Sequence, residues 1–292
     1  MTSMANGIWS NGFGTERVEK RREGSVLELL KANMLAHFAY YRRSRLLQAF
    51  LLVFLLMTGM NSLPPLFYDS GVENFNTLQA TYASLNWFLL FFAGGLSLFI
   101  ISSHLRNRSL KMVFTKPCSP ALWLGSTFLS AITVSLLLNV VIFASAMSLS
   151  LIWHLPVRTA LLFISLDTFI ASVAIIAYLM LLTTLVHPAI AATLALIFNA
   201  SLFYDAQFWA ESVVRSGNPN LFLRVLDRLF QVLYLLAPMV HAFDNKTEGI
   251  YTSLRVAHGD WKYILYSLGY TSVLSVFCYL LALFALLRKQ HT

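Results

Sequence analysis

The sequence predicts an all-α polytopic membrane protein with about six transmembrane helices. Of its 292 residues, 58% are hydrophobic and 12% are charged, its mean hydropathy is +0.67, and long apolar runs alternate with short polar segments. Soluble domains carry about 25% charged residues, so this composition cannot cover a water-facing surface. The net charge of +8 fits basic residues in cytoplasmic loops and near anionic headgroups, and it is no evidence for nucleic-acid binding.

The N-terminal part divides into a polar tail, residues 1–24, and an amphipathic helix, residues 25–45. Ser25 stands three residues before Glu28, which is the spacing of a capping box. Leu27, Leu30, Met34 and Phe38 then recur at helical spacing. We expect this helix to lie on the inner membrane surface, the alternative being an ordinary amphipathic helix packed on another domain.

The transmembrane domain is predicted over residues 46–292, and each spanning helix needs about 20 apolar residues. The six apolar segments are approximately Leu46–Leu66, Leu85–Ser103, Leu122–Trp153, Val157–Val186, Pro188–Trp209 and Tyr263–Leu287.

The distribution of charge predicts that both termini are cytoplasmic in an inner, or plasma, membrane. Arg42, Arg43 and Arg45 precede the first span, and Arg288 and Lys289 follow the last. The first loop carries Asp69 and Glu73 but no Lys or Arg, which indicates that it lies outside.

Residues 210–262 form the predicted outer loop, which contains an amphipathic or re-entrant helix before Pro238. In this helix a narrow polar stripe recurs every three or four residues: Arg224, Asp227, Arg228 and Gln231. Counting the helix as a seventh span would place these charges in hydrocarbon and the basic C-terminus outside.

The most informative segment is the cytoplasmic loop 104–121, between the second and third spans. It contains four cations and no acid: Arg106, Arg108, Lys111 and Lys116. The loop is a plausible handle for a soluble partner, and the alternative is a plain topogenic loop that obeys the positive-inside rule.

Catalytic motifs are not found in the sequence. It lacks a nucleotide-binding P-loop and an H-E-x-x-H zinc motif, its seven histidines are scattered, and we expect neither a metal nor a cofactor. The two cysteines, Cys118 and Cys278, fall in the basic loop and in the last span, so they are unlikely to pair.

Asp167 is the most conspicuous polar residue within a predicted span, with Asn139, Asn199 and Asp205 as possible neighbours. An ionisable group at such depth is a candidate functional residue, and the alternative is a carboxyl that joins helices. Small residues also cluster on the second span, from Ala93 to Ser97, and on the third, at Ser126 and Ser130. They permit close helix approach, either within the chain or in a dimer.

The whole arrangement resembles the permease subunits of ABC-2 type ABC transporters. The most specific likeness is Thr115-Lys116-Pro117, followed by Ser119 and by Leu124-Gly125 at the start of the third span. Tyr234-Leu-Leu-Ala-Pro238 resembles an apolar, proline-ended stretch in the outer loop of that family.

The resemblance implies a permease that works as a dimer, with a second copy or a paralogue, and is driven by a separate ATPase subunit. It assigns the loop as a coupling helix whose contacts would come from Arg106, Arg108, Lys111, Phe114, Lys116 and Pro117. The expected cargo, which an exporter would carry, is amphipathic or lipid-linked, because the spans hold few charges. Two alternatives are an integral-membrane enzyme that uses Asp167 and a non-transporting scaffold that recruits a soluble partner.

Overall fold

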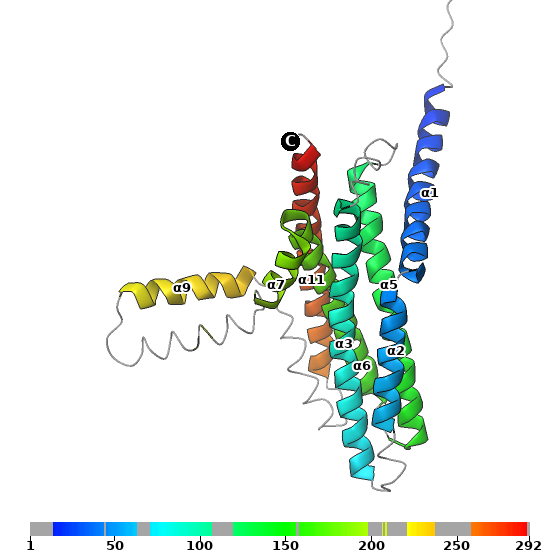
Figure 1. Cartoon of the computed structure of the whole chain (residues 1–292), viewed down its shortest axis with the longest axis vertical. Coiled ribbons are helices and arrows are strands. Elements are labelled where there is room, and N and C mark those ends of the chain that lie inside the picture. Colours follow the sequence, from blue (N-terminus) through cyan, green and yellow to red (C-terminus); the bar gives the residue numbers. More distant parts are fainter. Residues whose placement is uncertain are drawn as a thin grey trace, which may run out of the picture.

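The computed structural model describes residues 14–43, 45–62, 71–106, 119–155, 158–197, 206, 208, 221–236 and 258–290. Within these ranges the chain is helical and contains no strand, which confirms the all-α part of the prediction. The elements are α1 (Gly14–Arg43), α2 (Arg45–Ser62), α3 (Gly71–Arg106), α5 (Pro120–Ile152), α6 (Arg158–Leu185), α7 (Pro188–Ile197), α9 (Leu221–Leu236) and α11 (His258–Gln290). Figure 1 shows a bundle of long helices with α9 directed away from it.

Four described helices are long and apolar enough to cross a membrane: Ala80–Ser103 in α3, Pro120–Ile152 in α5, Leu161–Leu185 in α6 and Trp261–Arg288 in α11. They correspond to the second, third, fourth and sixth predicted spans. A fifth candidate joins α1 and α2 through a bend of 57°. The predicted fifth span begins at Pro188 with α7, whose described part ends at Ile197, so the count of six stays a prediction.

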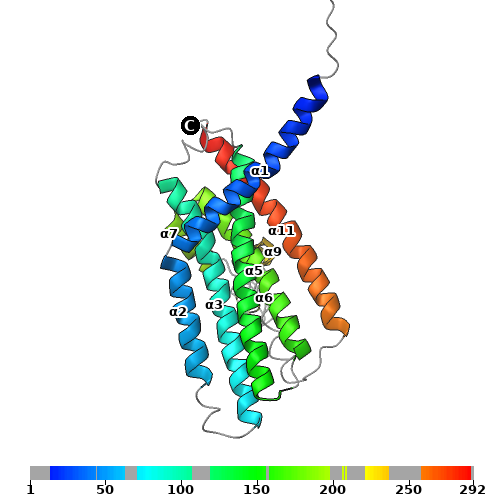
Figure 2. The same ribbon diagram turned by 90° about the vertical axis from the view of Figure 1, so that its right-hand side faces the viewer.

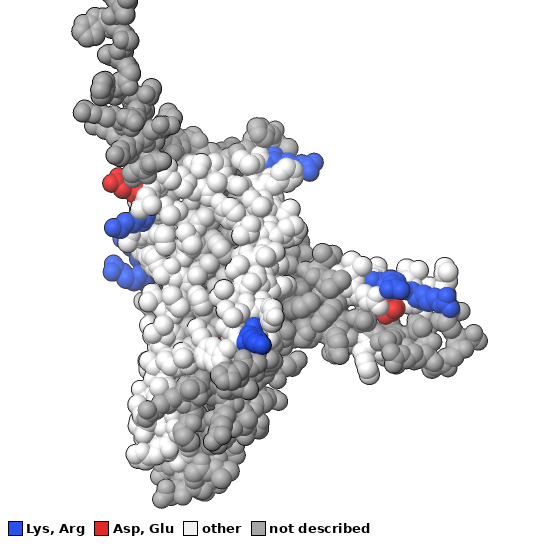
Figure 3. Space-filling model, turned by 180° about the vertical axis from the view of Figure 1, so that it is seen from behind, with Lys and Arg blue, Asp and Glu red and all other residues white. Residues whose placement is uncertain are grey.

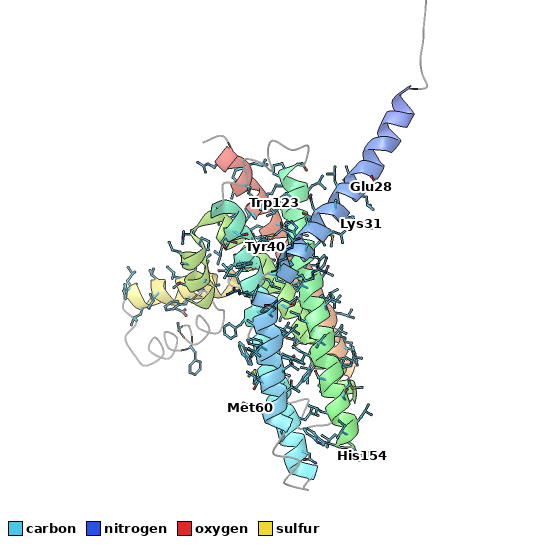
Figure 4. The ribbon with its side chains drawn as sticks, turned by 45° about the vertical axis from the view of Figure 1, so that its right-hand side comes forward. Glu28, Lys31, Tyr40, Met60, Trp123 and His154 are labelled. Carbon is cyan, nitrogen blue, oxygen red and sulfur yellow. The ribbon has the colours of Figure 1, made fainter. Side chains whose placement is uncertain are left out.

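Helix α6 lies at the centre of the bundle and contacts α3, α5, α7 and α11. The end of α3, the start of α5 and the end of α11 lie at one end of the bundle, and the loop between α5 and α6 lies at the other (Figures 1 and 2). Figure 4 shows this polarity, with Trp123 toward the first end and Met60 and His154 toward the second.

Helix α1 begins at Gly14, so the prediction that the helix begins at Ser25 was wrong. The segment before Ser25 is rich in Glu, Lys and Arg, which are good helix formers, and its sequence places Glu16 and Lys20 four residues apart, a spacing that favours a helix. On the predicted apolar face, Leu27 is exposed in the chain and Phe38 packs against the core. His37 and Tyr41 are the buried side chains of the described part of α1.

Helix α5 begins as its sequence signals indicate. The Ser119 hydroxyl accepts a hydrogen bond from the backbone N–H of Leu122 at 3.2 Å, and Pro120 occupies the first turn. At the other end, His154 takes a left-handed conformation with φ of 54°. The backbone N–H of Leu155 donates to the Ser150 carbonyl at 2.9 Å, which closes the turn that follows the helix.

The small residues of α3 serve packing within the chain. A Cβ atom added at Gly94 would lie 2.8 Å from Cδ1 of Leu179 and 3.4 Å from Cγ2 of Ile175, both on α6. Glycine therefore lets α3 approach α6 closely at this level, as small residues do in membrane helix pairs. The sequence had left an intermolecular use of the same patch equally open.

The polar stripe predicted on α9 lies on one side of that helix. Arg228 Nη1 donates to Gln231 Oε1 at 3.1 Å, and Gln231 Nε2 donates to Asp227 Oδ2 at 3.2 Å. The exposed apolar side chains of α9 are Leu221, Phe222, Val225, Leu229 and Val232. Figure 3 shows the charges of α9 and α1 at the margins, with a largely uncharged flank between them.

Candidate functional site

The residues predicted to engage an ATPase lie at and beyond the end of α3. Arg106 is the last residue of α3. Arg108, Lys111, Phe114, Lys116 and Pro117 lie outside the described residues, as does Cys118. The structure does describe the two helices that flank this basic segment, and they pack against each other.

The start of α5 is anchored to the last helix. The Tyr279 hydroxyl of α11 donates to the backbone carbonyl of Ala121 at 2.8 Å. Leu124 is fully buried in a cluster that also includes Ile101 of α3, Met180 of α6 and Cys278 of α11. The helix that follows the basic segment, α5, is therefore held against the bundle through its first turns.

Gly125, which the family resemblance singled out, lies beneath Tyr279. A Cβ atom at this position would be 3.5 Å from the Tyr279 hydroxyl oxygen and 3.9 Å from Cε2, which are ordinary contact distances. The Leu124-Gly125 pair therefore places a large apolar side chain in the core and leaves room beside it for the tyrosine.

Asp167 lies on α6 and is 1% exposed. Its carboxyl interacts electrostatically with the hydroxyl of Tyr263 on α11. One turn earlier, Phe163 meets Trp261 of α11 edge-to-face, with 6.0 Å between the ring centroids. Asp167 therefore lies near the seam between α6 and α11, one turn from this aromatic contact.

Asn139, which was expected near Asp167, contacts a different residue of the same helix. Its Nδ2 donates to the backbone carbonyl and to the hydroxyl of Ser165, both at 3.0 Å. The structure therefore assigns Asn139 to the α5–α6 contact and Asp167 to the α6–α11 contact. Asn199, the third predicted residue, lies outside the described residues.

The sequence reasoning missed the seam between α6 and α11, in which one face of α11 is buried. The buried residues recur at intervals of three or four: Ile264, Ser267, Thr271, Ser275, Cys278, Ala282 and Leu286. Most are small, α11 packs on α6, and Ala177 of α6 lies in one buried cluster with Cys278 and Ala282. Small side chains in both helices permit the close approach, and this spacing is the signal that could have revealed the pair.

A second missed contact joins α1 to α5. His37 Nε2 lies 3.3 Å from the Thr127 hydroxyl oxygen, and both side chains are buried. Ser126 and Ser130, the small residues of the third span, are completely buried on α5. The small residues on this face of α5 therefore pack within the chain. In α1, the sequence feature that indicates the contact is the four-residue spacing of His37 and Tyr41.

The described residues contain no group of three or more His, Cys, Asp or Glu side chains that could hold a metal ion. The buried polar side chains of the described residues are hydroxyls, many of which bond to a carbonyl of their own helix, together with two asparagines, His37 and the single carboxyl of Asp167. Comparison with protein-family models, with curated proteins and with solved structures gives no match to this chain.

Proposed function

We propose that this chain is the membrane-spanning permease subunit of an ABC-2 type ABC transporter, an exporter that works as a dimer with a separate ATPase. The proposed subunit has six spans. Four are the candidate spans in α3, α5, α6 and α11, and the other two are α2 and the segment that begins with α7. Loop 104–121 is its cytoplasmic coupling element, residues 210–262 are its outer element, and both termini are cytoplasmic.

The observation that supports the proposal is that the basic segment joins the ends of two helices that pack in the bundle. It connects the end of α3 to the start of α5, and both helices pack against each other and against the central α6. The Tyr279–Ala121 hydrogen bond extends the connection to α11. A partner that grips this segment would therefore push on the ends of packed helices, and packed interiors transmit displacement because they have low compressibility.

The cargo we propose is amphipathic or lipid-linked. The buried polar groups of the described spans are almost all uncharged, and Asp167 is occupied in the α6–α11 seam. A charged, water-filled path through one subunit would need more ionisable side chains than these helices supply. A route at the seam between two subunits, with lipid-facing helix surfaces as its walls, suits cargo that has its own apolar part.

The first test is the interaction with an ATPase. The chain is tagged and purified with its associated proteins, which are identified by mass spectrometry, and compared with the triple variant R106E/R108E/K111E. We expect the variant to lose a co-purifying Walker A ATPase, because the proposed contacts are cationic. The matched control, R224E/R228E/K262E, reverses three charges placed outside by the topology and should retain the ATPase. Retention by the loop variant would contradict the proposal.

The second test is the sidedness of the loop. The only other cysteine, Cys278, is buried, so a membrane-impermeant maleimide reports on Cys118 alone. We expect labelling only after the inner membrane is permeabilised, with a C118S variant as the control. Labelling in intact cells would place the loop outside and refute the coupling role.

Asp167 separates this proposal from the enzyme alternative. Because its buried carboxyl lies within electrostatic range of Tyr263 on the neighbouring helix α11, we assign it to helix pairing, and the variant D167N should keep ATP-dependent transport. An activity that persists without ATP and disappears in D167N would favour the membrane enzyme. A complex that binds the ATPase but moves no cargo would favour the scaffold.

A further inference from the structure

Helix α9 presents an exposed apolar side on which no other described helix packs extensively. The large exposed side chains recur along one side of the helix: Leu221, Phe222, Val225, Leu229 and Val232. The helix runs crosswise to the bundle in Figure 1, and Figure 2 shows it nearly end-on. Because the candidate spans run along the bundle, the direction of α9 is that of the membrane plane, as in interfacial amphipathic helices.

Two arginines border this apolar side. Each residue advances about 100° around a helix, so Arg228 stands about 40° from Val232, and Arg224 stands about 40° further round. Asp227, the single acid of α9, stands about 100° from Arg228, at the other edge of the polar stripe. Both arginine side chains are exposed, whereas Asp227 is half-buried. A negatively charged group that approaches along the apolar side therefore meets the arginines before it meets the carboxylate.

Hydrogen bonds within the stripe leave the arginines able to bind a ligand. Gln231 Nε2 donates to Asp227 Oδ2 at 3.2 Å, and Arg228 Nη1 donates to Gln231 Oε1 at 3.1 Å. The Gln231 amide thus stands between the carboxylate and the guanidinium. An arginine has five N–H donors, and this contact uses one of those of Arg228. The stripe as a whole carries two positive charges against one negative charge, which favours an anionic ligand.

The spacing of the two arginines suits a phosphate group. Side chains four residues apart on a helix have Cβ atoms about 5–6 Å apart, so two long guanidinium side chains can converge on one anion. A guanidinium matches the oxygens of phosphate with two parallel N–H bonds, and charge-assisted bonds of this kind are stronger than neutral ones. Inorganic phosphate or a phosphorylated peptide would meet the arginines but would leave the apolar side uncovered, whereas a lipid would cover both.

We propose that Arg224 and Arg228 bind the phosphate of a membrane phospholipid whose acyl chains lie along the exposed apolar side of α9. A phospholipid carries its phosphate next to its acyl chains, which is the order in which α9 presents its cations and its apolar side. The long arginine side chains can reach the headgroups while the helix itself stays in contact with hydrocarbon. This inference does not rest on the proposed transporter, and it applies to whichever leaflet α9 contacts.

A photoreactive lipid tests the site on the full chain. The probe is phosphatidylcholine with a diazirine on its headgroup, titrated into dodecyl maltoside micelles in a phosphate-free buffer, and adducts on α9 peptides are quantified by mass spectrometry. We expect saturable labelling of α9 in the wild type. The variant R224Q/R228Q should raise the half-saturating probe fraction at least about tenfold, because an arginine beside lipid headgroups contributes about fivefold in affinity. The variant R224K/R228K keeps the charge but loses the planar fork, and its half-saturating fraction should lie between the two.

Three controls accompany the titration. D227N keeps both arginines and an oxygen acceptor for Gln231, so it should bind the probe at least as tightly as the wild type. Adducts at the bend between α1 and α2, where Arg42, Arg43 and Arg45 are exposed, should not change in any variant. An excess of inorganic phosphate should not displace the probe, because it has no acyl chains.

Four results would overturn the proposal. They are labelling of wild-type α9 that does not saturate, displacement of the probe by inorganic phosphate, an unchanged half-saturating fraction in either arginine variant, and a loss in D227N as large as that in R224Q/R228Q.

Discussion

The close approach of α3 to α6 at Gly94 makes a quantitative prediction. A Cβ atom there would lie 2.8 Å from Cδ1 of Leu179, whereas one at the adjacent Gly95 would have no such atom within 4 Å. The two glycines are neighbours in the same helix, so replacement by alanine gains a similar amount of helix propensity at each. The difference between G94A and G95A therefore measures the helix contact alone.

The size of the stability difference between G94A and G95A follows from the atom that must move. Alanine in place of a mid-helix glycine stabilises by about 0.5–1 kcal/mol, which is the full expected effect of G95A. At Gly94 the Leu179 methyl must give way, and overpacking of this kind costs about 1–3 kcal/mol. Because the obstructing atom ends a flexible side chain, whose departure from its rotamer costs about 0.5–1.5 kcal/mol, we expect the low end. The G94A chain should thus be about 1 kcal/mol less stable than the G95A chain.

The assay is unfolding of the purified chain in mixed micelles, followed by loss of helicity as the SDS fraction increases. A double-mutant cycle supplies the specificity, because L179A removes the obstructing methyl. L179A alone should destabilise by about 2–5 kcal/mol through the cavity it leaves. G94A should cost less in the L179A background than in the wild type, with a coupling of about 1 kcal/mol. Equal stabilities of G94A and G95A, or strict additivity in the cycle, would refute the packing of α3 on α6 at this glycine.

Two further predictions concern α1 and α9. The variant T127V removes the hydroxyl that faces His37, and should destabilise by about 0.6–1.7 kcal/mol, the range of polar contacts between membrane helices; hydrogen exchange of the α1 amides should quicken. In α9, a nitroxide at the exposed Val225 should lie in lipid when the chain is in nanodiscs, whereas one at Arg228 on the polar stripe should lie in water. Oxygen should therefore relax the first label more strongly, and a soluble nickel complex the second.

Each of these has a matched control. T133V removes a hydroxyl of α5 that bonds only within its own helix, to the Leu129 carbonyl, and should leave exchange in α1 unchanged. Quickened exchange in both variants would mean that α5 itself is disturbed and that the His37 contact is not what holds α1. For α9, equal oxygen and nickel accessibility at the two labels would show that this helix does not lie at a membrane interface.

The ends of α5 and α6 were predictable from the sequence to within a few residues, whereas α3 begins at Gly71 and not near the predicted Leu85. The start of α5 is signalled by Ser119 and Pro120, and its apolar run continues to Ile152. Both signals are local, because a cap needs only its own turn and a span needs only its length. The start of α1 was not predicted correctly, because a charged helix outside the membrane has no hydropathy signal. Its Glu, Lys and Arg residues were interpreted as a polar tail.

The pairing of helix faces was much less predictable. Asn139 and Asp167 were expected to meet, yet Asn139 contacts Ser165 and Asp167 faces Tyr263. A periodic pattern identifies one face of a helix but not the neighbour that covers it. Likewise Gly94 and Ser130 are small for the same general reason, close approach, but α6 is the neighbour of the first and α1 lies near the second. Only the tertiary arrangement decides between these partners.

The central position of α6 bears on the proposed mechanism more directly than any single residue. All four candidate spans are similarly compatible with a membrane, but 61% of the α6 window is buried in the chain against 28% of the α11 window. Helices α3 and α5 pack on α6 more extensively than on α11, so a displacement delivered to their ends reaches α11 mainly through α6. The smaller direct contact of α5 with α11 includes the Tyr279–Ala121 bond. The variant Y279F therefore separates the two routes: coupling that passes through α6 survives the loss of this hydroxyl, whereas coupling that passes directly between α5 and α11 does not.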